Sequence, residues 1–115
     1  MNSYETEIPS EVLTFIAELP PHTRAQMLRK IGLLETFGTQ LSGKSSKPLG
    51  GGLYELRTTG SNAQRLYYGF IGRLAVIVHH GGKGGKTAQN QDIAAARRLL
   101  ASRVARGLRG TDAAR

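Results

Sequence analysis

The stretch LYELRTTGSNAQRLYYGFIGRLAVIVHH, residues 53–80, decides the fold. Apolar and polar residues alternate over 53–58 and again over 65–70, a period of two that is typical of strands with one buried face. The run 74–80 is apolar on both faces, which predicts a central strand covered on both sides. Turn residues join the three segments, so we expect an antiparallel β-meander.

Two helices are expected before this meander. Residues 12–19 place apolar side chains at helical spacing, and Pro20-Pro21 ends that helix and begins the next. We expect the second helix to end at Gly38. The inner face of the second helix is predicted to consist of Met27, Leu28, Ile31 and Leu34. Residues 2–8 are expected as a short edge strand.

One helix is expected after the meander, over residues 88–106. Its inner side is predicted to hold Ile93, Ala96, Leu100 and Val104. Residues 38–52 are rich in Gly, Ser and Lys, which is loop composition. The order β-α-α-β-β-β-α predicts an α+β fold, with helices packed on one face of an antiparallel sheet. We expect a single domain over residues 1–106 and a flexible tail over 107–115.

The charge is unevenly distributed along the 115 residues. The whole chain carries a net charge of +8, but residues 1–40 carry −2 and the remainder +10. Such an excess indicates an anionic partner such as nucleic acid. The chain has no Cys, which excludes disulfides, thiolate metal sites and Cys nucleophiles. No spanning segment or signal peptide is apparent, so we expect a cytoplasmic protein.

Arg57, Arg65 and Tyr67 are predicted to share one open face of the sheet, because alternation points them to the same side of neighbouring strands. Arginine binds phosphate oxygens through two parallel hydrogen bonds, and tyrosine can stack on a base or transfer a proton. The cluster therefore suits RNA. The alternative is a surface pair of Arg57 with Glu55 beside a half-buried tyrosine.

His79 and His80 are adjacent on a strand and point to opposite faces, so they do not suit a shared metal ion. No acidic cluster accompanies them or His22, and we expect neither a metal site nor a cofactor. One of the two is expected in the core. The other, beside the glycine-rich loop, is a candidate general acid or base because its ordinary pKa is about 6.5.

The loop GGKGGKT, residues 81–87, resembles a P-loop but has the wrong spacing, since only three residues separate Gly81 from Gly-Lys-Thr. An antiparallel sheet also argues against nucleotide hydrolysis. A weaker interpretation remains, in which backbone N–H groups, Lys83 and Lys86 bind a phosphate at the start of the last helix. The alternative is a basic connection without a ligand.

Taken in order, KPL at 47–49, GLYELR at 52–57, RLYY at 65–68 and KTAQNQDI at 86–93 resemble the RelE/HigB-like toxins. Within that superfamily the chain is most similar to the phage-derived Gp49-like and addiction-module killer proteins. The resemblance covers about residues 4–103.

This resemblance implies a toxin of a type II toxin–antitoxin system, which cleaves mRNA on the ribosome and is neutralised by a helix-turn-helix, HigA-like antitoxin in a joint oligomer. Its basic residues map onto Arg57, Arg65 and Lys86, and His80 stands before the Gly-Gly pair. We therefore predict four catalytic residues: Arg65, Arg57, Tyr67 and His80. Further RNA or phosphate contacts are predicted at Lys47, Lys83, Lys86, Arg73 and Arg98.

Metal-free RNA cleavage requires activation of a ribose 2′-OH, stabilisation of the charged transition state and protonation of the leaving 5′-oxygen. The two arginines suit the second task, and Tyr67, His79 or His80 the proton transfers. Arg65→Ala is predicted to abolish toxicity while the fold persists. The alternatives are a basic RNA- or ribosome-binding module without chemistry and a phage-derived interaction protein.

Overall fold

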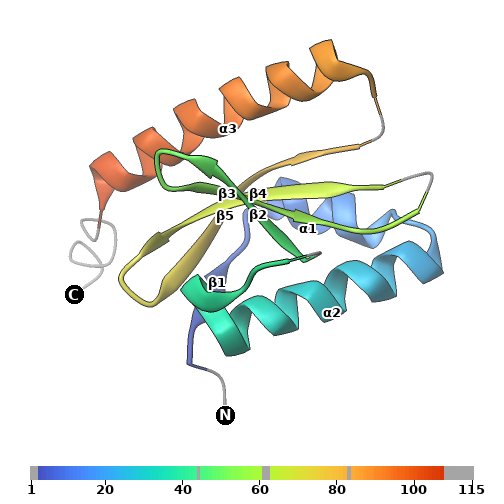
Figure 1. Ribbon diagram of the computed structural model, residues 1–115, viewed down its shortest axis with the longest axis horizontal. Helices are drawn as coiled ribbons and strands as arrows, with labels where there is room; N and C mark the ends of the chain where they lie inside the picture. Colours follow the sequence, from blue (N-terminus) through green and yellow to red (C-terminus); the bar gives the residue numbers. More distant parts are fainter. Residues whose placement is uncertain (1–2, 44, 61–62, 83, 108–115) are drawn as a thin grey trace.

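A computed structural model of the chain describes residues 3–43, 45–60, 63–82 and 84–107. Figure 1 shows a twisted sheet between two helices on one side and one long helix on the other. The elements in chain order are β1 (Glu5–Glu7), α1 (Ser10–Ala17), α2 (Pro21–Phe37), a 3-10 turn (Gly38–Gln40), β2 (Ser46–Gly50), β3 (Leu53–Arg57), β4 (Arg65–Ile71), β5 (Leu74–Gly81) and α3 (Lys86–Arg106). The predicted α+β fold is confirmed.

The five strands form one mixed sheet in the order β1-β5-β4-β3-β2. β2 to β5 are antiparallel neighbours, but β1 pairs with β5 in parallel, with Glu5 opposite Leu74. The prediction of a wholly antiparallel sheet is therefore wrong at this pair. A period of two reports which residues are buried, but it does not report the direction of the neighbouring strand.

β2 lies within the segment that was predicted to be a loop, and that prediction is wrong for residues 46–50. The strand is held by side chains from elsewhere in the chain. Ser46 is buried and shares a hydrogen bond with the hydroxyl of Tyr68, and Arg97 of α3 donates to the carbonyls of Leu49 and Gly50. These long-range contacts override a local composition that is typical of loops.

Both faces of the sheet are covered, which corrects the prediction that all helices pack on one face. α1 and α2 bury Val12, Ile16, Met27 and Leu34 against one face, which contributes Leu56, Leu66, Tyr68 and Ile77. α3 buries Ala96 and Leu100 against the other face, which contributes Leu53, Tyr67, Val76 and Val78. Along the strands, residues that point to either face of the sheet are buried, because helices cover both faces.

The helix boundaries follow the sequence signals. Pro21 is the first residue of α2, and Gly38 follows its end with a φ of 53°, a left-handed conformation that suits glycine. The prediction that Leu28 and Val104 lie on the inner faces of their helices is wrong, because Leu28 is 53% exposed and Val104 is 50% exposed. Of the predicted tail, only Gly107 belongs to the described residues.

Candidate active site

Four side chains lie in one row across the sheet. Lys47 on β2 is opposite Glu55 on β3, Glu55 is opposite Tyr67 on β4, and Tyr67 is opposite His79 on β5. Residues that are directly opposite share a face, and this is the face that α3 covers. Glu55, Tyr67 and His79 therefore lie on the face that α3 covers, while Lys47 is exposed at the edge of the row.

Arg57 and Arg65 are directly opposite each other in the neighbouring row, at the end of the β3–β4 hairpin. Alternation places them on the same face as Glu55 and Tyr67, as predicted. The face is not open, however, because Tyr67 is fully buried under α3. The arginines lie where this covered face reaches solvent.

The two arginines line an open cavity of about 300 Å³. Its other walls come from the turn after β3, with Thr58, Thr59, Gly60 and Ala63. Paired hydrogen bonds between Thr58 and Gln64 close this turn, at 3.0 Å from Thr58 N to Gln64 O and 2.8 Å from Gln64 N to Thr58 Oγ1. Gln26 of α2 also accepts from the Thr59 amide. The cavity is a basic pocket at the end of the β3–β4 hairpin.

The partner of Glu55 is Arg65, whereas the alternative interpretation of the sequence paired Glu55 with Arg57. Arg65 Nε lies 3.3 Å from Glu55 Oε2, and the Glu55 side chain is only 1% exposed. Both carboxylate oxygens lack an aligned hydrogen bond from any described residue. Arg65 also donates through Nη1 to the Gly82 carbonyl at 3.3 Å. A buried carboxylate is compensated here by a single guanidinium.

Tyr67 is a buried neutral side chain. Burial, together with the negative charges of Glu55 and Asp92 and against the opposing effect of Arg65, raises its pKa to about 12. Such a hydroxyl keeps its proton at neutral pH. Tyr67 is thus unsuited to act as a general base.

The two histidines contact different helices, but their rings are not on strictly opposite faces as predicted, since the ring centroids lie 5.6 Å apart. His79 Nε2 lies 3.3 Å from Asp92 Oδ1 of α3, and its ring stacks near Tyr67 with centroids 6.0 Å apart. His80 instead stacks on Phe15 of α1, with centroids 4.1 Å apart. Burial lowers the pKa of His80. The histidine on the face of the arginines is therefore His79.

A close approach at Gly81 allows Asp92 to reach this site. A Cβ atom at Gly81 would lie 2.5 Å from Asp92 Oδ2 and 3.5 Å from Tyr67 Cε2. The space that this glycine leaves is filled by the carboxylate from α3. The glycine before the loop is thus required by packing over the site.

The remaining predicted basic residues are dispersed. Lys47 is exposed on the edge strand β2, and Lys86 is exposed at the start of α3. Arg98 is exposed on α3, and Lys83 lies outside the described residues. Arg73 is in the β4–β5 turn, stacked over Tyr4 at the other end of a seven-residue strand, about 20 Å from Arg65. The structure therefore separates Arg73 from the arginine pair.

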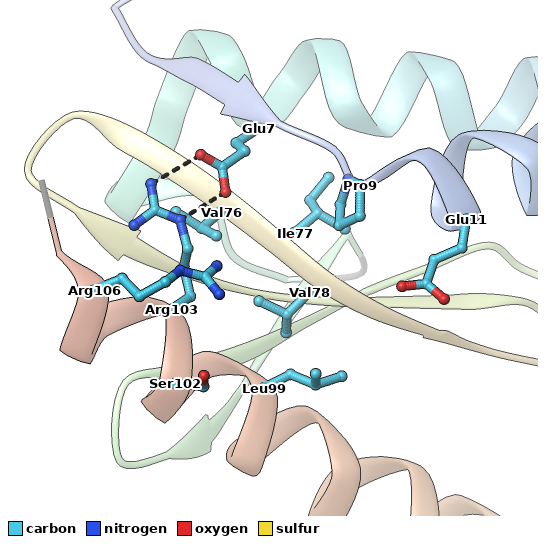
Figure 2. A pocket seen from close by; sticks show the side chains of 10 residues that line it. All are labelled: Glu7, Pro9, Glu11, Val76, Ile77, Val78, Leu99, Ser102, Arg103 and Arg106. Carbon is cyan, nitrogen blue, oxygen red and sulfur yellow. Dashed lines mark hydrogen bonds and ion pairs between the residues drawn. The ribbon is translucent and has the colours of Figure 1, made fainter. Parts of the chain in front are cut away.

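A second pocket, of about 200 Å³, lies between β5 and the last turns of α3 (Figure 2). Arg103 makes a two-point ion pair there with Glu7, at 2.8 Å from Nε to Oε2 and 2.9 Å from Nη2 to Oε1. The hydrogen bond from Arg103 lowers the pKa of Glu7. The pair ties α3 to β1, and the charge of Arg103 is already compensated by Glu7.

The sequence analysis assigned no role to Asp92, and it considered Glu55 only as the partner of Arg57 in a surface pair. Alternation placed Glu55 on the correct face, but only the position of α3 shows that this face is covered. An acidic residue between Leu53 and Leu56, both fully buried, was the available signal. Within the described ranges, no group of three metal-binding side chains exists.

A sheet covered on both faces by this order of helices, with a basic cavity at its hairpin end, is an α+β architecture, the class predicted from the resemblance to the RelE/HigB-like toxins. A family model described as "Phage derived protein Gp49-like (DUF891)" matches residues 14–101. The chain belongs to this family, as the sequence resemblance predicted. No curated protein matches the chain. In the described part of the chain, no helix is long and apolar enough to span a bilayer.

Proposed function

We propose that the protein is the toxin of a type II toxin–antitoxin system and cleaves mRNA on the ribosome. The observation that carries this proposal is the pair Arg57 and Arg65, which line one cavity at the solvent end of the covered face. Guanidinium groups bind phosphate oxygens and stabilise charge that develops during phosphoryl transfer. Membership in the Gp49-like family supports the same function.

In the proposed reaction, the ribose 2′-oxygen attacks the adjacent phosphorus and the bond to the 5′-oxygen breaks. The products are a 2′,3′-cyclic phosphate and a 5′-hydroxyl. One proton leaves the 2′-OH and one is delivered to the 5′-oxygen. Arg57 and Arg65 stabilise the additional negative charge on the phosphate, and no metal ion takes part.

Proton transfer is assigned to His79 among the alternatives Tyr67, His79 and His80. His79 is 25% exposed, shares the face of the arginines and is oriented by Asp92. Tyr67 is fully buried, and the ring of His80 packs on the α1 side. The ribosome supplies the further orientation that so small a site lacks.

Lys47 and Lys86 extend the basic surface on either side and contact neighbouring phosphates. The cognate antitoxin is a HigA-like helix-turn-helix protein with an acidic segment, because it must bind a strongly basic surface. Toxin and antitoxin form a joint oligomer in the cytoplasm.

A second candidate is an RNA- or ribosome-binding module without cleavage. The burial of Tyr67, with its pKa raised to about 12, favours this alternative because it removes one predicted proton-transfer group. The arginine cavity would then bind phosphate only, with affinity that falls steeply as salt increases.

Controlled expression in bacteria distinguishes these candidates. Wild type and Arg57→Ala are induced in parallel, growth is followed, and the 5′ ends of ribosome-associated mRNA are mapped. The toxin predicts growth arrest and new cuts within ribosome-bound codons, both absent with Arg57→Ala. Intact mRNA together with salt-sensitive RNA binding supports the binding module instead.

A further inference from the structure

Glu55 is a buried charge that the proposed reaction does not use. Its side chain is 1% exposed in the middle of the sheet, between Lys47 and Tyr67 in register. Lys47 is exposed, and the hydroxyl of Tyr67 has no hydrogen-bond partner among the described residues. Burial of a carboxylate is costly unless a cation compensates it, so such a residue requires a specific reason.

The position of Arg65 supplies that reason. Its guanidinium has two partners: Nε faces Glu55 Oε2 in an ion pair at 3.3 Å without an aligned hydrogen bond, and Nη1 donates to the Gly82 carbonyl at 3.3 Å. Arg65 is 15% exposed and still lines the cavity that Arg57 lines. The buried edge of the guanidinium is thus fixed, while the side chain reaches the solvent-accessible cavity.

Charge balance leads to the same conclusion. Arg57 and Arg65 are directly opposite each other across β3 and β4, and like charges in that position repel. Among the described carboxylates, only Glu55 forms an ion pair with either of them. Before a phosphate binds, Glu55 is the group that compensates this repulsion.

We infer that Glu55 is a positioning residue, which holds Arg65 beside Arg57 so that the two guanidiniums form a preformed site for one RNA phosphate. This inference rests on the proposed function. Glu55 does not contact RNA, because its side chain is buried, does not line the cavity and is linked to it through Arg65. A fixed guanidinium loses less conformational entropy on binding than a free one.

A double-mutant cycle tests this role, with Glu55→Gln, Arg65→Gln and the double variant. The probe is a short single-stranded RNA with 2′-O-methyl riboses, which binds but cannot be cleaved. Glu55→Gln is expected to weaken binding about tenfold alone and less than about twofold in the Arg65→Gln background. Equal weakening in both backgrounds, or none in either, would overturn the inference. Glu7→Gln is the matched control, since it removes a carboxylate that pairs with another arginine, Arg103, outside the cavity.

A measurement on the wild type covers the case in which Glu55→Gln does not fold. The Nε–H groups of arginine are resolved by ¹⁵N NMR, and Arg57 serves as the internal comparison. Slow hydrogen exchange at Arg65 and fast exchange at Arg57 are expected. Equal exchange at the two arginines would contradict a held guanidinium.

The outcomes separate this inference from the proposed function. Suppose that the wild type binds the probe but does not cut mRNA, and that the effect of Glu55→Gln on binding depends on Arg65. This result supports the role of Glu55 and refutes cleavage. If instead the wild type cuts mRNA, but Glu55→Gln has the same effect with and without Arg65, the result supports cleavage and refutes the role of Glu55. A wild type that does not bind the probe overturns the phosphate site.

Discussion

Arg65→Ala should weaken the fold as well as the site, because it leaves Glu55 buried without its cation. At 3.3 Å and an effective dielectric constant of about 20, the Coulomb attraction between the two groups is about 5 kcal/mol. Removal of one partner from a buried pair costs about 3–5 kcal/mol. Water reaches the partly exposed Arg65, so we expect a loss of about 3 kcal/mol, a large share of the stability of a small domain.

The assay is urea unfolding followed by far-UV circular dichroism. Arg57→Ala is the matched control, since no described carboxylate pairs with Arg57, and it should change the free energy of unfolding by less than about 0.5 kcal/mol. The double variant Glu55→Gln/Arg65→Ala should be about 2 kcal/mol more stable than Arg65→Ala, because it no longer buries an unpaired charge.

Two results would refute this reasoning. Arg65→Ala could prove as stable as the wild type, or the double variant could prove no more stable than Arg65→Ala. The expected result changes how growth assays are interpreted. The sequence predicted that Arg65→Ala retains its fold, whereas the structure indicates that lost toxicity in this variant reflects both stability and chemistry. Arg57→Ala isolates the chemistry.

Three further predictions concern packing and pH. Gly69→Ala should destabilise the protein by about 1–3 kcal/mol in urea unfolding, because its Cβ would lie 2.7 Å from Leu100; an unchanged midpoint would show that α3 shifts freely. Leu34→Ala should cost about 2–5 kcal/mol in the same assay, since Leu34 is fully buried, and a cost below 1 kcal/mol would contradict the packing of α2. Glu7→Gln should cost at most about 1 kcal/mol at pH 7. Because Arg103 lowers the pKa of Glu7, that difference should fade as pH falls below about 4 in pH-dependent unfolding, and a difference that grows on acidification would exclude the ion pair.

The sequence predicted the helices and four of the five strands because each signal was local. Pro21 and Gly38 bound α2, and alternation placed Leu66 and Tyr68 on one face and Tyr67 on the other, as the structure shows. β2 was missed since its stabilising contacts come from other elements, namely Tyr68 on β4 and Arg97 on α3. Local composition carries no information about such contacts.

The candidate site was predicted in part for the same reason. The register that joins Arg57 to Arg65 follows from hairpin pairing, which the alternation of two neighbouring strands makes visible. The coverage of that face by α3 depends on tertiary packing, so the buried state of Tyr67 and the pair of Glu55 with Arg65 were not predictable. Asp92 reaches His79 from a helix that follows β5 by way of a loop, and only the structure brings them together.

The most direct test of the central claim is single-turnover cleavage of mRNA on translating ribosomes by purified wild type and purified Arg57→Ala. The free energy of unfolding of both proteins is measured in parallel. We predict cuts by the wild type at the ribosome-bound codon and a loss of cleavage rate of about a hundredfold or more in an equally stable Arg57→Ala. Equal cleavage rates for the two proteins would contradict the assignment of the arginine cavity as the active site.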